Sequence, residues 1–332
     1  MICQVPVGRV SLLTAAMSER RRALRTVALT IGIVAFASAP ATHALGAQPP
    51  HRSILAEKMR ADLRRIADDT RGVVGAQVID LATGDRIGVN DTLTFPQGSA
   101  IKIPLLIELY RQDAVGQLKL STRVPVRQAD RTGCSGLLLN LGDGTSELSL
   151  GDLAMFMITV SDNTATNMLI DRVGMDKVNG TMRELGVPQV KLQRKMIRPR
   201  DSAAGNENIA TPTGAATIMA KIARCELPMP KERCGELRKL LEIPKGGPIE
   251  ASVPEGVRVA WKPGDIEGVN TAWGLVDLPG RPYVVVGMVN YSDASDAERA
   301  LRRIADAAYG YFHVLARSTP YGARVPLEVV PK

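Results

Sequence analysis

Histidine is scarce in this chain of 332 residues, which contains only His43, His51 and His313. His43 and His51 lie near the start of the chain and His313 in a late helical stretch, and the four cysteines form no C-x-x-C pair, so no group has the spacing of a metal site. The glycine-rich patterns that cradle phosphates, G-x-x-x-x-G-K-[ST] and G-x-G-x-x-G, are also missing. The sequence therefore predicts a protein that uses neither a metal nor another cofactor.

Long apolar runs are equally rare. The run from Val27 to Ala37 follows a cluster of arginines and precedes small residues, and it is shorter than the ~20 residues that span a bilayer. This arrangement is typical of a secretory signal peptide, which we assign to residues 1–47. We expect the remaining residues, 48–332, to form a catalytic domain in the periplasm or outside the cell, with no membrane anchor.

A strong excess of positive charge is absent once the leader is set aside. The whole chain has 42 basic and 34 acidic residues. Residues 1–47 contain five arginines and one glutamate, which leaves 37 basic and 33 acidic residues and a charge of +4. Nucleic acid is therefore not an expected partner. With 45% hydrophobic residues and no linker or repeat, the sequence predicts one soluble globular unit, and we expect a monomer.

The two ends of the chain predict one α/β (α+β) lobe. Residues 54–66 have helical apolar spacing and are followed by extended runs over 73–81 and up to residue 95. Near the other end, strands are predicted over 257–262, 271–276 and 283–291, and a helix over 297–315. Residues 52–98 and 250–318 are thus expected to form an antiparallel sheet flanked by the N- and C-terminal helices.

The middle of the chain, residues 99–249, predicts an all-helical lobe. Its clearest helical patterns cover residues 152–159, 165–173, 175–185 and 212–223. A cleft between two lobes is a usual place for a functional site. Cys225 and Cys234 are close in sequence, so they could form a disulfide in an oxidising compartment or remain two separate thiols.

A candidate nucleophile lies at the start of the helical lobe. None of the three histidines is near a candidate serine, so lysine is the remaining common base. Lys102 is the one lysine with a serine three positions before it, which places Ser99 and Lys102 on the same helix face. Pro104 predicts an irregular first turn. The alternative is an ordinary capping serine beside a solvated lysine.

Two further short motifs follow. Ser161-Asp162-Asn163 lies between two predicted helices, and Lys262-Pro263-Gly264 ends a predicted strand. Either could be ordinary, because Ser-Asp-Asn is a common helix cap. Lys245-Gly246-Gly247 has a similar pattern to the last motif, but it lies in a Pro/Gly loop without a strand, so we set it aside.

In this order and context, the three motifs resemble those of the class A serine β-lactamases and the related penicillin-binding proteins, whose signature is S-x-x-K, S-D-N and K-T-G. The resemblance covers residues 52–318, with 62 positions from Ser99 to Ser161 and 163 from Ser99 to Lys262. It implies the serine β-lactamase/transpeptidase-like fold. It also implies a small-molecule β-lactam or a D-Ala-D-Ala peptide as substrate.

The resemblance implies catalytic roles for four residues. Ser99 would attack the lactam or peptide carbonyl, and Lys102 would take or relay its proton. Ser161 would pass a proton to the departing nitrogen, with Lys262 close by. Because two lysines in one cleft repel each other, at least one is expected to have a lowered pKa, which suits a base.

It also implies binding roles. Asn163 would hydrogen-bond the amide of the substrate side chain, whereas Asp162 is expected to be structural. Gly264 and Asp265 would line the substrate, and the backbone N–H groups of Ser99 and Asp265 would form the oxyanion hole.

Two departures from the family pattern concern the release of the acyl group and the binding of the substrate carboxylate. The E-x-x-L-N motif, whose glutamate activates the water that releases the acyl group, is missing. The corresponding stretch offers Asp201 and Glu207 as possible deacylation bases, although Glu207 could simply cap or pair. Pro263 replaces the threonine of K-T-G, and Asp265 adds a negative charge where an anionic substrate would lie.

Three hypotheses remain open. The chain is a β-lactam hydrolase, or a D-Ala-D-Ala peptidase or penicillin-binding protein that releases its acyl group slowly, or a non-catalytic module that binds β-lactams or peptidoglycan. Ser99, Lys102, Ser161, Asn163 and Lys262 are all present, which favours the two catalytic hypotheses.

Overall fold

The computed structural model describes residues 50–141 and 146–329. The predicted signal peptide, residues 1–47, lies outside the described residues. Within the described ranges, none of the helices combines the length and the apolar character that a membrane span requires.

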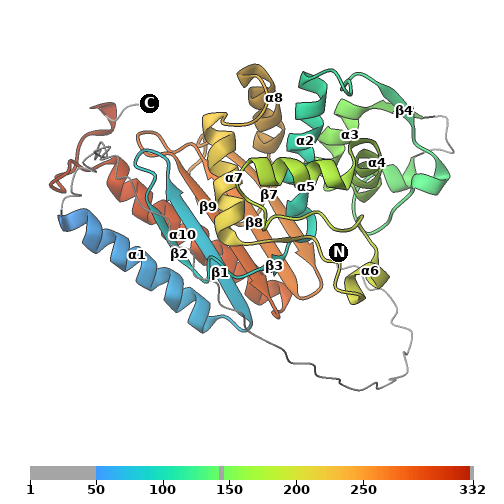
Figure 1. Cartoon of the computed structure of the whole chain (residues 1–332). Coiled ribbons are helices and arrows are strands. Elements are labelled where there is room, and N and C mark those ends of the chain that lie inside the picture. The colour runs from blue at the N-terminus through green and yellow to red at the C-terminus, as the bar shows by residue number, and fades with distance from the viewer. Residues whose placement is uncertain (1–49, 142–145, 330–332) are drawn as a thin grey trace, which may run out of the picture. The chain divides into compact units, whose positions relative to one another are not determined.

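Both ends of the described chain build one five-stranded antiparallel sheet, in the order β2-β1-β9-β8-β7 (Figure 1). Its strands are β1 (Val73–Asp80), β2 (Arg86–Val89), β7 (Val259–Ile266), β8 (Val269–Val276) and β9 (Tyr283–Asn290). Strand β7 forms one edge of the sheet, which leaves it beside the segment that carries Ser99. The predicted antiparallel sheet is confirmed.

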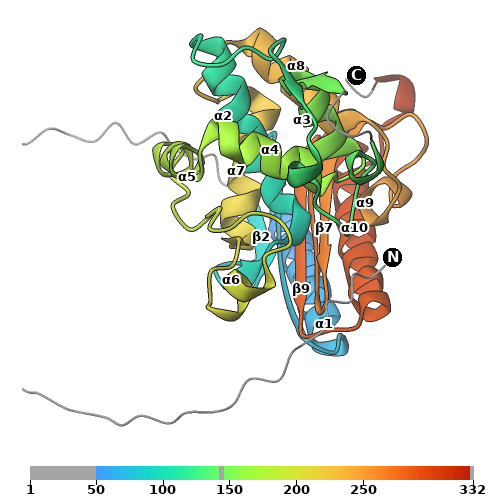
Figure 2. The ribbon, with the colours of Figure 1, turned by 90° about the vertical axis from the view of Figure 1, so that its right-hand side faces the viewer.

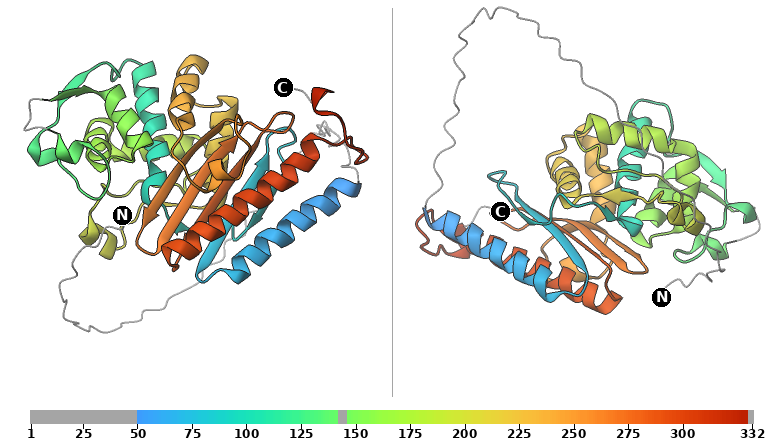
Figure 3. Two further views of the ribbon diagram at one scale, coloured as in Figure 1. Left: turned by 180° about the vertical axis from the view of Figure 1, so that it is seen from behind. Right: turned by 60° about the horizontal axis from the view of Figure 1, so that its bottom comes forward.

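Helices cover both faces of this sheet. Helix α1 (Pro50–Asp69) and helix α10 (Ala294–Ala316) lie side by side on one face, and helix α7 (Pro212–Arg224) lies on the other (Figures 2 and 3). Met59 and Leu63 of α1 and Phe312 of α10 are buried in the core beneath the first pair. Because both faces are covered, β1 and β9 are buried along almost their whole length and lack a polar alternation.

Most of the remaining described residues form the helical lobe. Its helices are α2 (Lys102–Ala114), α3 (Leu150–Thr159), α4 (Asn163–Val173), α5 (Met175–Glu184), α6 (Pro199–Ala203) and α8 (Lys231–Glu242). The short helix α9 (Pro248–Ala251) packs instead against α10 and the sheet. Short 3₁₀ turns are η1 (Gly98–Ile101), η2 (Gln128–Asp130), η3 (Leu138–Asn140) and η4 (Leu327–Val329). The 3₁₀ turn η1 immediately before α2 confirms the irregular start predicted from Pro104.

The predicted fold class is confirmed, but the region predicted as all-helical also contains short strands. Strand β4 (Arg123–Pro125) pairs with β5 (Glu147–Ser149), and β6 (Ile209–Ala210) pairs with β3 (Phe95–Pro96). Segments of two or three residues are too short to show an alternating pattern, so they could not be predicted from the sequence.

Local signals explain where the helices around the site begin and end. Ser149 caps α3, Asp162 caps α4 and Thr211 caps α7, each through a side-chain oxygen that accepts a backbone N–H. Helix α7 ends at Cys225, which forms a disulfide with Cys234 of α8. Of the two alternatives open at the sequence level, the structure contains the bridge.

Candidate active site

Ser99 lies in the 3₁₀ turn η1, directly against the edge strand β7. A Cβ atom on Gly264 would come within 2.2 Å of the Gln97 carbonyl oxygen and 2.5 Å of the Ala100 nitrogen. Glycine is therefore required at position 264 by the close approach of two backbones. Ser99 is half-buried, and its Oγ forms no hydrogen bond with any residue in the described ranges.

The buried side chain of Gln97 fixes this turn to the sheet. Its Nε2 donates to the Phe95 carbonyl oxygen at 2.8 Å, and its Oε1 accepts from Trp273 Nε1 at 2.9 Å. Its carbonyl oxygen accepts from Thr271 Oγ1 at 3.0 Å. Sequence reasoning missed these positioning residues, because isolated polar residues within apolar strands give no indication of the partner they meet.

Lys102 is completely buried and holds three contacts through Nζ. It donates to the carbonyl oxygen of Ser161 at 2.7 Å, and it lies 3.1 Å from Ser161 Oγ and 3.0 Å from Asn163 Oδ1. The first and third partners can only accept a hydrogen bond. The Ser161 hydroxyl can also donate, so this set can satisfy a neutral amine with two N–H groups and one lone pair.

Lys262 reaches the same hydroxyl from the sheet. Its Nζ lies 3.2 Å from Ser161 Oγ and donates to the Pro263 carbonyl oxygen at 3.0 Å. The structure thus brings Ser161 between the two lysines that the motifs predicted. A hydroxyl in this position can accept from one nitrogen while it donates to the other, which connects Lys102 and Lys262 by one proton path.

Both lysines have lowered pKa values. Burial, and secondarily the charge of Lys262, holds the pKa of Lys102 well below its usual 10.5, with partial opposition from Asp162 and Asp265. Burial, together with the charge of Lys245, lowers the pKa of Lys262 to about 7. At neutral pH a neutral amine is therefore accessible in the site, which a lysine that acts as a base requires.

The backbone of Ser161 is held in an unfavourable conformation, with φ of +55°. Asp162 stabilises it. One carboxylate oxygen caps α4 through Ala165 N, and the other accepts from the backbone N–H groups of Leu137 and Leu138 at 2.7 and 2.8 Å. These contacts agree with the structural role expected for Asp162, which binds the loop that faces the N-terminus of α4.

Asn163 connects Lys102 to this same loop. Its Oδ1 accepts from Lys102, its Nδ2 donates to the Gly133 carbonyl oxygen at 3.0 Å, and its backbone N–H donates to the Ser135 carbonyl oxygen at 3.2 Å. The side-chain amide therefore positions Lys102 in the free protein. Its contact with a substrate amide remains a prediction.

The predicted oxyanion-hole residues lie next to each other. A Cβ atom on Gly98 would come within 2.8 Å of the Asp265 backbone nitrogen, so the residue before Ser99 abuts that nitrogen. The Asp265 side chain is exposed. Pro263 occupies the neighbouring position on the edge strand and has no N–H group to offer a substrate. The role of this edge in stabilising an oxyanion remains a prediction.

The two candidate deacylation bases, Asp201 and Glu207, differ in their surroundings. Glu207 forms an ion pair with Arg194 at 2.8 Å, and Asp201 is exposed on the short helix α6. Neither carboxylate hydrogen-bonds Ser99, Lys102 or Ser161 within the described chain. The pairing of Glu207 agrees with the simpler of the two roles considered for it, and it lowers the carboxylate's availability as a base.

Lys245, whose motif we excluded as a candidate for K-T-G, nevertheless affects the electrostatics of the site. Its Nζ donates to the carbonyl oxygens of Leu241 and Ile243, and burial lowers its pKa to about 8, with Glu250 opposing. Its charge also helps to lower the pKa of Lys262. The loop is tied to β7 because Glu250 accepts from both Trp261 Nε1 and the Lys245 backbone N–H.

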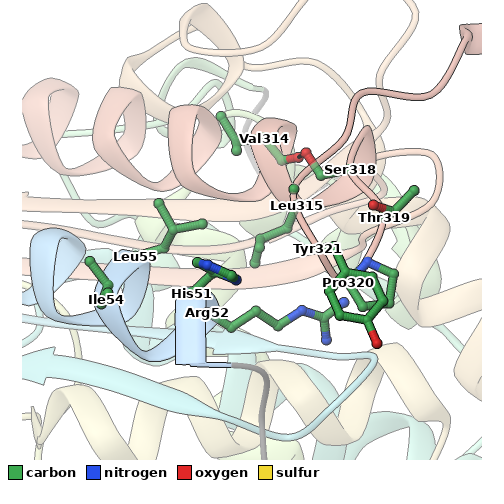
Figure 4. Close-up of a pocket in the computed structure, with 11 residues that line it drawn as sticks. His51, Arg52, Ile54, Leu55, Val314, Leu315, Ser318, Thr319, Pro320 and Tyr321 are labelled. Carbon is green, nitrogen blue, oxygen red and sulfur yellow. Dashed lines mark hydrogen bonds between the residues drawn. The ribbon is translucent and has the colours of Figure 1, made fainter.

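A separate cavity, which none of these residues lines, lies elsewhere in the molecule. It has a volume of about 340 Å³ and lies between the start of α1 and the segment after α10, where His51, Arg52, Leu315 and Tyr321 line it (Figure 4). None of the predicted site residues lines it. Among the described residues, no group of three or more histidine, cysteine, aspartate or glutamate side chains could hold a metal ion.

The comparisons with known proteins agree on one family. Residues 58–312 match the model of the β-lactamase enzyme family. A β-lactamase of Sphaerobacter thermophilus is 34% identical, with a TM-score of 0.71, over 77% of this chain and 97% of the other. The protein PBP-A is 25% identical, with a TM-score of 0.71, over 77% of this chain and 96% of its own.

Among curated sequences, β-lactamase L2 of Stenotrophomonas maltophilia is 26% identical over 263 residues, which is 75% of this chain and 85% of the relative. β-Lactamase SME-1 of Serratia marcescens is 24% identical over 253 residues, 74% of this chain and 85% of that protein. The match to the family model, residues 58–312, includes the segments that carry all three motifs.

Proposed function

The chain belongs to the β-lactamase enzyme family, and on that premise we propose that it opens β-lactam rings through an acyl-enzyme on Ser99 and then hydrolyses that acyl-enzyme. A hydrolase-like enzyme is what the β-lactamase relatives support. The observation that carries the finer proposal is the contact of Ser161 Oγ with both Lys102 Nζ and Lys262 Nζ.

Acylation uses the proton path through these groups. The neutral Lys102 amine takes the Ser99 hydroxyl proton, and Ser99 Oγ forms a bond to the lactam carbonyl carbon. The backbone N–H groups of Ser99 and Asp265 stabilise the oxyanion. As the carbon–nitrogen bond of the ring breaks, Ser161 gives its proton to the departing nitrogen and regains one from Lys262 or Lys102. Water then cleaves the ester.

The second candidate is a D-Ala-D-Ala peptidase or a penicillin-binding protein that releases its acyl group slowly. The ion pair of Glu207 with Arg194 favours this candidate, because it occupies a carboxylate oxygen that a water molecule would otherwise contact. The likeness to PBP-A is compatible with it. The substrate in either case is a small molecule or peptide that carries an amide carbonyl.

A pulse of benzylpenicillin followed by intact-mass measurement tests both candidates. We expect the protein to gain the mass of one penicillin, and Ser99→Ala to gain none. Ser295→Ala, which changes an exposed serine of α10, is the matched control and should behave as the wild type. An adduct that disappears within seconds supports the hydrolase, and one that persists for hours supports slow release. No adduct together with no loss of any β-lactam from the solution would favour a binding module that has lost catalysis.

We also propose that the protein acts in the periplasm or outside the cell, as a monomer. The disulfide between Cys225 and Cys234 supports an oxidising compartment. Fractionation of the producing cells and size-exclusion chromatography with light scattering test these two statements.

A further inference from the structure

A second, small cavity lies in the helical lobe. It has a volume of about 80 Å³, and three segments enclose it: the loop after β4, helix α4 and the loop before α6. Its polar lining comes from Asp130, Thr132, Asn167, Asp171, Lys195 and Arg198. None of these residues has a part in the acylation mechanism above.

This cavity is one helical turn away from the candidate active site. Asn167 follows Asn163 by four residues on α4, a rise of about 6 Å along the same face. The loop on the other side makes the same connection, since Gly133 contacts Asn163 and the neighbouring Thr132 contacts Asn167. The cavity therefore lies beside the same loop that contacts Asn163, about one helical turn further along α4.

Asn167 holds the walls of the cavity in place. Its Nδ2 donates to Thr132 Oγ1 at 3.1 Å and to the Met196 carbonyl oxygen at 3.2 Å, and its Oδ1 accepts from Met196 N at 2.8 Å. One buried amide thus joins all three enclosing segments. The cavity is a preformed feature of the fold, and its charged groups project from fixed backbone.

The charges that line the cavity are balanced but incompletely paired. Lys195 forms an ion pair with Asp171 at 2.5 Å. Arg198 has no ion-pair or hydrogen-bond partner for its guanidinium among the described residues, and it is exposed. Asp130 uses one carboxylate oxygen to accept from the Arg127 N–H at 3.0 Å, and its other oxygen has no partner in the described chain. One acid and one base thus share a cavity without contacting each other.

We propose that this cavity is a subsite for a substrate side chain that ends in an amino-acid head group, with the ammonium at Asp130 and the carboxylate at Arg198. The inference rests on the proposed function of Ser99. A water needs roughly 10–15 Å³ on this scale, so the cavity holds about five to eight water-sized groups, enough for the five non-hydrogen atoms of –CH(NH₃⁺)CO₂⁻. The lining has two acidic and two basic side chains, so a ligand with a single charge would be repelled by as many of them as attract it.

The test compares three cephalosporins. Cephalosporin C has an acyl side chain that ends in an amino-acid head group, glutaryl-7-aminocephalosporanic acid has a similar chain without the ammonium, and cephalothin has an uncharged side chain. The second-order rate of Ser99 acylation is measured by intact mass. We expect cephalosporin C to react about tenfold or more faster than the glutaryl compound, because the glutaryl chain lacks the ammonium and so loses the charge-assisted hydrogen bond at Asp130.

Variants of the cavity sharpen the comparison. Arg198→Ala and Asp130→Asn should each slow acylation by cephalosporin C by about tenfold and leave cephalothin within about twofold of the wild type. Arg200→Ala, which removes an exposed arginine of α6 outside the cavity, should leave all three rates unchanged. Equal rates for the three compounds, or unchanged rates in both cavity variants, would overturn the subsite.

A failure of the acyl-enzyme itself gives a different result, namely no adduct with any of the three compounds. Calorimetric binding to the Ser99→Ala variant then tests the cavity independently of chemistry. Tighter binding of cephalosporin C than of cephalothin, lost in Ser99→Ala/Arg198→Ala, supports the subsite. Equal binding of the two compounds refutes it.

Discussion

Replacing Lys262 by methionine should stabilise the protein at neutral pH and destabilise it at alkaline pH. An unfolded lysine titrates near 10.5, whereas burial brings the pKa of Lys262 to about 7 in the folded protein. Below pH 7 the full cost of burying the charge applies, about 5 kcal/mol at 1.36 kcal/mol per pKa unit. The cost decreases as the pH rises from 7 to 10.5, and it vanishes above that range.

The magnitude at each pH follows from these two pKa values. The cost is about 4 kcal/mol at pH 7 and about 1 kcal/mol at pH 10. Methionine avoids this cost but loses the hydrogen bonds to Ser161 Oγ and the Pro263 carbonyl oxygen, at about 1 kcal/mol each. The net change is a gain of about 2 kcal/mol at pH 7 and a loss of about 1 kcal/mol at pH 10. Relief of Lys102 from a neighbouring positive charge acts in the stabilising direction.

Urea unfolding followed by circular dichroism measures this difference. With an m value of about 3 kcal/mol/M, the midpoint of Lys262→Met should lie about 0.7 M above that of the wild type at pH 7. Lys239→Met, which changes an exposed lysine of α8, is the control and should show no pH-dependent difference. A lower midpoint at pH 7, or the same difference at both pH values, would refute the reasoning.

Three further results are expected. The rate of Ser99 acylation should decline above pH 7 as Lys262 loses its proton, and Lys262→Arg, which stays charged, should remove this decline in a pH–rate series. If the rate of the variant declines at the same pH as that of the wild type, Lys262 is not the group responsible. Gly136→Ala should destabilise the protein by about 2 kcal/mol or more in thermal unfolding, because φ is +105° and the new Cβ would lie 2.2 Å from Asp162 Oδ2. The control Gly133→Ala, whose new Cβ meets no atom within 4 Å, should cost less than about 1 kcal/mol. The double variant Cys225→Ala/Cys234→Ala should lose about 2–3 kcal/mol in urea unfolding because it opens a short closed loop, and an unchanged midpoint would argue against that account.

The sequence predicted most of the sheet and the terminal helices, because their patterns are local. It did not predict α8, whose buried apolar side chains are limited to Cys234, Leu237 and Leu241. The spacing of these three residues is helical, but so few apolar positions in a charged segment do not separate a helix from a loop. Tertiary packing against its neighbours decides this segment, and local propensity carries little of the information.

The sequence predicted which residues belong to the candidate site, but not how most of them are arranged in space. Ser99 and Lys102 could be placed on one helix face because three residues separate them. Ser161 is 59 residues from Lys102 and 101 from Lys262, so its position between the two amines depends on how the lobes pack. The same applies to Glu207, because its availability as a base depends on the ion pair with Arg194.

The site also concentrates features that oppose folding. Ser161 has a positive φ, and Lys102 and Lys262 bury amino groups in a region where charge is costly. The contacts that compensate come from residues outside the proposed mechanism: Asp162 holds the strained turn, and Gln97 fixes the turn that carries Ser99 to the sheet. The lowered lysine pKa values and the instability of the site therefore have one physical cause, the burial of two amines around one hydroxyl. A substitution that replaces one of these buried amines by an apolar side chain is expected to raise stability at neutral pH. It also removes an amine that the proposed mechanism of Ser99 uses, so higher stability and lower activity should appear together.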